Sequence, residues 1–158
     1  MSIALEIFER VARATKNVSQ TQAAESRSGH PFDERNIHPE VATASKKLFD
    51  DGHFSQATFE ALKFLDNKVK TLSGVQDSGF NLMMAAFTER NPRIQLTDLV
   101  TASDKDEQLG FRHMFAGSMS GIRNPRAHDI LVDPIDLCLD HLSLASVLMR
   151  RLDARKAP

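Results

Sequence analysis

Apolar residues recur at helical spacing in six stretches of the chain. The stretches cover residues 3–16, 39–51, 54–72, 78–87, 104–122 and 134–152. The clearest is 54–72, where one face carries Thr58, Ala61, Leu62, Leu65, Val69 and Leu72. No stretch alternates apolar and polar residues long enough to make a β-sheet. The pattern predicts an all-α protein, folded as an antiparallel helical bundle of four to five helices.

The second and third stretches are bounded by residues that start and stop helices. Pro39 suits a first helical turn, where its missing N–H leaves no partner unsatisfied. Gly52 and Gly74 suit helix ends because glycine adopts left-handed backbone conformations easily. Since only a short turn around Gly52 separates the two helices, they are expected to form an antiparallel pair.

The helix over 104–122 carries an unusual glycine face. Ser103 or Asp104 can cap its start. Pro125 disfavours helical backbone at the preceding residue, so the helix is expected to end near Arg123. Each glycine inside a helix costs about 1 kcal/mol relative to alanine. Close approach of another backbone is the simplest reason for three of them: Gly110, Gly117 and Gly121.

The chain divides into three parts on the same evidence. Residues 1–30 are expected to form an N-terminal helix and a polar linker, residues 31–153 the helical domain, and residues 154–158 a disordered tail. The last helix is expected to take Asp133 as its N-cap and Pro134 as its first residue.

Composition excludes several classes of protein. No apolar run approaches the ~20 residues needed to cross a bilayer, and Glu6 and Glu9 interrupt the N-terminal apolar stretch of a would-be signal peptide. The lone Cys138, in an apolar run, is expected to be a buried thiol, which suits the cytoplasm. The net charge of -1 and the lack of Tyr and Trp argue against an extended nucleic-acid surface with aromatic stacking, but leave room for a small phosphate site.

The segment 123–128 (RNPRAH) is the candidate for chemistry. Arg123 offers a planar fork of donors that fits phosphate oxygens, and His128 can both take and give a proton near neutral pH. Together they suffice to cut RNA without a metal, since a base can let the 2′-hydroxyl attack the adjacent phosphorus. Asn124 could donate a further hydrogen bond, Arg126 would add positive charge at the substrate, and Pro125 would fix the loop.

A plainer interpretation of this segment stays open. Arg123 could simply favour a helix C-terminus, and His128 could be an ordinary surface residue. Three further residues are weaker candidates for substrate binding: Arg112, His113 and Asp129. A structural role is favoured for His113 and a loop role for Asp129. The six histidines have no metal-ligand spacing, so neither a metal nor a cofactor is expected.

Several short motifs resemble one family. The segment 121–128 (GIRNPRAH) resembles the Arg-x4-6-His signature of the HEPN superfamily. The segments 37–41 (IHPEV), 52–54 (GHF) and 110–117 (GFRHMFAG) resemble motifs of its Ymh-type members from bacteria and phage-related loci, and the likeness covers residues 32–152.

The resemblance implies a helical bundle that forms a homodimer, with the two Arg–His pairs meeting across the axis in one cleft. It also implies an RNA-cutting toxin or abortive-infection effector in antiphage defence, restrained by an antitoxin or another regulatory protein. One subgroup has a tyrosine two residues after the histidine. Ile130 stands there in this chain, which excludes regulation through that tyrosine. The alternative is a non-catalytic HEPN-like module that binds nucleotides, RNA or a protein.

Overall fold

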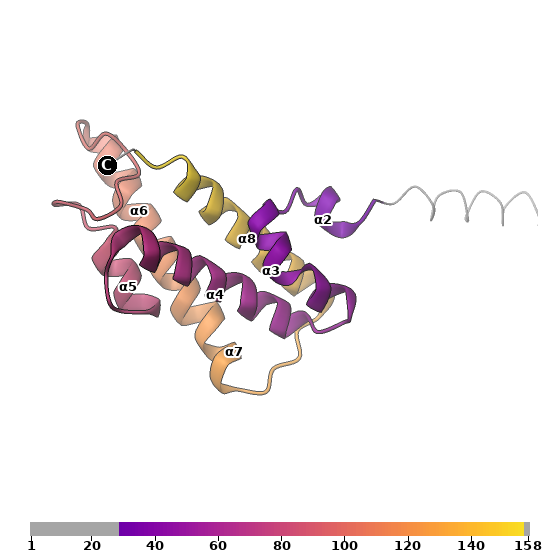
Figure 1. Cartoon of the computed structure of the whole chain (residues 1–158). Helices are drawn as coiled ribbons and strands as arrows, with labels where there is room; N and C mark the ends of the chain where they lie inside the picture. The colour runs from indigo at the N-terminus through magenta and orange to yellow at the C-terminus, as the bar shows by residue number, and fades with distance from the viewer. Residues whose placement is uncertain (1–28, 157–158) are drawn as a thin grey trace, which may run out of the picture. The chain divides into compact units, whose positions relative to one another are not determined.

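The computed structural model describes residues 29–156, and all regular secondary structure in that range is helical (Figure 1). This confirms the predicted all-α class. The chain separates into two units with a boundary between Glu34 and Arg35, four residues after the predicted linker. The short helix α2 (Pro31–Glu34) belongs to the first unit, and the predicted helix over 3–16 lies outside the described residues.

The second unit opens with the predicted pair of antiparallel helices, α3 (Pro39–Asp50) and α4 (Phe54–Ser73), which lie side by side in Figure 1. The ring of His38 caps α3 by accepting a hydrogen bond from the backbone N–H of Glu40. Gly52 and Gly74 have φ values of 79° and 68°, a left-handed conformation that strains residues with a Cβ. Both glycines therefore end helices as their positions predicted.

Helix α4 is the centre of the second unit, because five other elements pack on it. They are α3, α5 (Gly79–Ala86), η1 (Met119–Arg123), α7 (Asn124–His128) and α8 (Ile135–Asp153). Its predicted stripe is buried, with Ala61, Leu62, Leu65 and Val69 at most 1% exposed. Burying a side chain of this size stabilises the fold by about 1.5–3 kcal/mol. Other fully buried side chains come from every long helix around it and include Leu82, Met83, Phe87, Phe115, Met119, Leu142, Leu148 and Met149.

The start of α6 (Ala102–Ser118) differs from the prediction. Thr101, not Ser103 or Asp104, is the N-cap. Its hydroxyl accepts from the N–H of Asp104, whose carboxylate accepts from the N–H of Thr101 in return. This reciprocal arrangement satisfies two donors that a helix start leaves open, which explains why the cap lies earlier than expected.

The predicted helix end near Arg123 is wrong. Helix α6 continues through one wider turn, η1 (Met119–Arg123), into α7 (Asn124–His128). In η1 the N–H of Asn124 donates to the carbonyl of Met119, five residues earlier instead of four. Proline inside an α-helix clashes with the carbonyl four residues back. The wider turn directly before Pro125 accommodates that ring, so the backbone stays helical to His128.

The C-terminal part of the chain also differs in detail. Helix α8 (Ile135–Asp153) has Pro134 as its N-cap, because Asp133 uses its carboxylate elsewhere. Residues 154–156 were predicted to be disordered, but the N–H of Lys156 donates to the carbonyl of Gln95 and its ammonium pairs with Asp98. The described part of the tail is therefore attached to the 87–101 connection.

Candidate functional site

Arg123 lies at the end of η1, against α4. Its guanidinium carbon is 6.0 Å from the centre of the Phe59 ring, and its Nη1 donates to the side-chain oxygen of Asn124 at 2.8 Å. The Nε atom is buried without a hydrogen-bond partner. The arginine is thus partly buried, with its guanidinium at cation–π distance from an aromatic ring and one of its nitrogens hydrogen-bonded to Asn124.

His128 is the last residue of α7 and is exposed. Its position is five residues after that of Arg123, with four residues between them, which corresponds to about 140° around a helix axis. Within residues 29–156, no hydrogen bond or ion pair joins these two side chains. The two side chains of one chain therefore start from different sides of the helix and are not joined directly.

Arg126 is held in a buried ion pair. Its Nε and Nη2 donate to the two carboxylate oxygens of Asp133, each at 2.7 Å, and its Nη1 donates to the carbonyl of Ile122 at 2.8 Å. The two side chains are only 6% and 5% exposed. All three guanidinium nitrogens donate hydrogen bonds within the protein, so Arg126 has a structural role here. The sequence had suggested a substrate contact instead.

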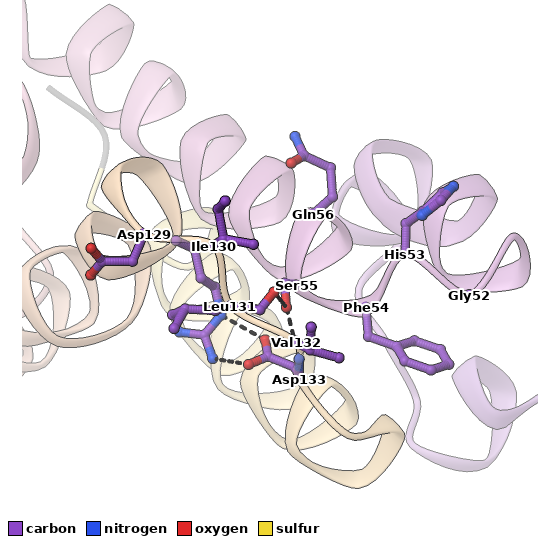
Figure 2. Close-up of a pocket in the computed structure, with 11 residues that line it drawn as sticks. Gly52, His53, Phe54, Ser55, Gln56, Asp129, Ile130, Leu131, Val132 and Asp133 are labelled. Carbon is purple, nitrogen blue, oxygen red and sulfur yellow. Dashed lines mark hydrogen bonds and ion pairs between the residues drawn. The ribbon is translucent and has the colours of Figure 1, made fainter.

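Ser55 completes this network from the start of α4. Its hydroxyl donates to the carbonyl of Leu131 and accepts from the N–H of Asp133, both at 2.8 Å. The network therefore ties α7, the loop 129–134 and α4 together (Figure 2). Sequence reasoning missed it, since Ser55 and Asp133 lie 78 positions apart. The one available signal was an acidic residue seven positions after an arginine, across a loop.

A surface cavity of about 550 Å³ lies between the start of α4 and the loop 129–134 (Figure 2). It is lined by residues 52–56 on one side and by Arg126 and residues 129–133 on the other. In Figure 2, Ile130, Gln56 and His53 project on the same side of this cavity. Asp129, the residue after His128, lines this cavity, whereas His128 itself does not.

Two titratable groups of α8 lie under the ion pair. Burial lowers the pKa of His141 below its ordinary 6.5, and the positive charge of Arg126 lowers it further against the opposing effect of Asp133. Burial raises the pKa of the Cys138 thiol, which is fully buried as predicted. Both groups are therefore held in their neutral forms at neutral pH.

The three weaker candidates fall in two places: Arg112 and His113 are neighbours on α6, and Asp129 follows α7. Arg112 joins α6 to α5, since its Nε donates to the carbonyl of Met84 and its Nη1 pairs with Glu89. His113 is exposed on α6, and Asp129 is exposed directly after α7. Of these, only Asp129 neighbours His128 and lines the cavity.

Residues 29–156 contain neither a cluster of metal-ligating side chains nor a helix suited to crossing a membrane. In that range no three His, Cys, Asp or Glu side chains are grouped so as to hold a metal ion. None of the helices described there combines the length and the apolar character that a membrane crossing requires.

Fold and site together define an all-helical protein that carries an Arg-Asn-Pro-Arg-Ala-His segment at the end of a long, π-turned helix. The chain belongs to the family described as "Protein of unknown function (Hypoth_ymh)", whose model matches residues 35–152. The matched range starts at the first residue of the second unit and includes α3 and the whole candidate segment. No curated protein and no solved structure matches the chain.

Proposed function

We propose that this protein is a metal-independent endoribonuclease of the HEPN kind, which works as a homodimer and cuts RNA by 2′-hydroxyl attack. The observation that carries the proposal is the state of His128. It is exposed at the end of α7, while Arg126 two residues earlier is locked to Asp133 and fixes the backbone beneath it. A general base has to be accessible and held in one place.

In this proposal, RNA cleavage requires only the His128 and Arg123 side chains of the two copies. His128 of one copy takes the proton of the 2′-hydroxyl, and the oxygen attacks the adjacent phosphorus. Arg123 stabilises the extra negative charge that develops on the phosphate oxygens. The bond from phosphorus to the 5′-oxygen breaks, and this oxygen takes up the proton that His128 removed from the 2′-hydroxyl. The products are a 2′,3′-cyclic phosphate and a free 5′-hydroxyl.

The glycine face of α6 supports a homodimer. A Cβ placed on Gly110, Gly117 or Gly121 would meet no other atom within 4 Å. The expected close approach of another backbone therefore does not occur within residues 29–156, and the face is open to a second copy. Gly117 and Gly121 stand four residues apart at the start of the π-turn, and Asn124 and His128 stand four residues apart on one side of α7 after it. A second copy that pairs along these turns would bring the two candidate segments together.

The test is an RNA cleavage assay in EDTA with analysis of the product ends. The parent protein is expected to yield cyclic phosphate and 5′-hydroxyl ends, and Arg123→Ala and His128→Ala are expected to abolish cleavage. Arg93→Ala is the matched control, because Arg93 is an exposed arginine on the 87–101 connection. Cleavage that persists in His128→Ala, or that needs a divalent metal, contradicts the proposal.

A second candidate is a module that binds RNA or nucleotides without cutting. The angle of about 140° between the positions of Arg123 and His128 around the helix axis favours it, since cleavage needs both side chains at one phosphate. Binding that is lost in Arg123→Ala, by a parent that never cleaves, would select this candidate. Under the first proposal, the biological role is that of a toxin or antiphage effector with an antitoxin or other restraining partner.

A further inference from the structure

A run of large apolar side chains is exposed directly after His128. Ile130 is 101% exposed and Val132 is 92% exposed. Ile135 and Leu137, at the start of α8, and Leu131 are each about two-fifths exposed. We call these residues the apolar ridge: Ile130, Leu131, Val132, Ile135 and Leu137. Contiguous exposed apolar side chains of this size mark interaction surfaces more often than single ones do.

The ridge is held in place from beneath. The N–H of Asp129 donates to the carbonyl of Pro125 at 2.9 Å, and Ser55 fixes Leu131 and Asp133 through their backbones. The ion pair between Asp133 and Arg126 closes the loop. Binding to a segment that is already ordered costs less conformational entropy than binding to a mobile loop. The network thus prepares the ridge to receive a partner.

Three residues of the ridge, Ile130, Leu131 and Val132, also line the cavity of about 550 Å³, opposite residues 52–56 (Figure 2). Phe54 and Gln56 line that opposite wall and provide both apolar and polar contacts. A cavity of this size beside an exposed apolar strip can take an anchoring side chain of a bound segment.

Charge around the ridge indicates the chemistry of the partner. Asp129 and Asp136 are exposed at its two ends, and Arg126 is already neutralised by Asp133. Carboxylates at this rim repel RNA phosphates. They also disfavour pairing of two ridges about a two-fold axis, because each copy would place its carboxylates near those of the other. The rim is complementary to lysine or arginine.

We propose that the apolar ridge is the docking site of a partner protein, through a segment whose apolar side chains are flanked by lysine or arginine. Because the ridge starts two residues after His128, the docked segment covers that imidazole and restrains cleavage. This second clause rests on the proposed ribonuclease function, whereas the docking itself does not. The restraining partner would therefore bind the ridge beside Arg123 and His128, and would not need to contact those two side chains to be recognised.

The experiment is a selection from a random peptide library displayed on phage, with the full-length protein as bait. Enriched peptides are expected to combine apolar residues with lysine or arginine. Their affinity is expected to fall at least about tenfold for the double variant Ile130→Ser with Val132→Ser, as when central apolar contacts are removed. The matched control is Val100→Ser, since Val100 is 76% exposed on a different connection. Thermal unfolding checks that all three proteins are equally folded.

Three results would overturn the docking proposal. The first is that no enriched peptide loses affinity for the double variant. The second is that the double variant no longer self-associates in sedimentation velocity, and the third is that it no longer binds RNA. The second assigns the ridge to another copy and the third to RNA. A final arm adds a selected peptide to the RNA cleavage assay, where inhibition is expected. If the parent protein does not cleave RNA at all, the proposed function fails while the peptide result still decides the docking site.

Discussion

Asp133 receives both of its carboxylate hydrogen bonds from Arg126, across a loop, at 2.7 Å each. Both side chains are almost fully buried. The pair joins the end of α7 to the start of α8 and thereby sets the position of His128 and of the apolar ridge. The segment that the sequence analysis singled out thus contains one arginine that holds the fold, Arg126, and another, Arg123, to which the proposed function assigns the substrate phosphate.

Removal of one partner of this pair is expected to destabilise the protein strongly. Arg126→Met leaves a buried carboxylate without its counter-charge, which costs about 3–5 kcal/mol. Urea unfolding followed by circular dichroism measures this loss. The double variant Arg126→Met with Asp133→Leu is expected to recover most of it, because no buried charge is left unpaired. A loss below about 0.5 kcal/mol, the range of ordinary surface substitutions, would contradict the structural role of the pair.

The glycine face is expected to respond in two opposite ways. Gly117→Ala should stabilise the fold by about 0.5–1 kcal/mol, since a methyl group there meets no atom of the chain and alanine favours helix. Gly117→Lys should instead convert a dimer to a monomer in sedimentation velocity, because a long charged side chain blocks the contact. Ala85→Lys, on an exposed position of α5, is the control. A Gly117→Lys variant that stays dimeric would remove this face from the interface.

Acid is expected to destabilise the protein through His141. Its pKa is lowered in the folded state, so below the ordinary value of 6.5 the unfolded state binds more protons. The stability contribution is therefore complete above 6.5 and is lost as the pH falls toward the folded-state pKa. Melting temperatures from about pH 7.5 to about pH 5.5 should fall less for His141→Gln than for the parent. Equal falls in both proteins would show that His141 is not responsible.

The single thiol is expected to report on unfolding. Cys138 is fully buried and its pKa is raised by burial, so little thiolate is present or accessible. A disulfide reagent should modify it at least about a hundredfold more slowly than free cysteine, and the rate should rise in urea together with the loss of helix signal. Rapid modification of the folded protein would show that α8 opens locally or is less well packed.

Local chemistry in the sequence predicted much of the fold. The stripe on α4, the stop at Gly52 and the first-turn position of Pro39 depend on neighbours within a few residues, and all three were confirmed. The end of α6 was predicted wrongly because the rule that proline ends a helix does not anticipate a π-turn before Pro125. The cap of α8 was misplaced because Asp133 has a distant partner.

The candidate site was less predictable than the fold. Spacing located Arg123 and His128 on one short segment, but their directions depend on how the helix continues, which the sequence did not specify. The buried state of Arg126 depends on its pair with Asp133, and Asp133 is held by Ser55, which lies 78 positions away in the sequence. The ridge was not singled out either, since apolar residues near a helix start are equally compatible with a core position.

The most direct measurement of a shared site mixes two inactive variants. Arg123→Ala and His128→Ala are unfolded together, refolded and assayed on RNA in EDTA, and random pairing then gives about half heterodimers. Each heterodimer has one Arg123 and one His128 in the common cleft, so the account predicts that cleavage with 5′-hydroxyl ends returns. A mixture as inactive as its two components, beside a parent protein treated in the same way, would contradict it.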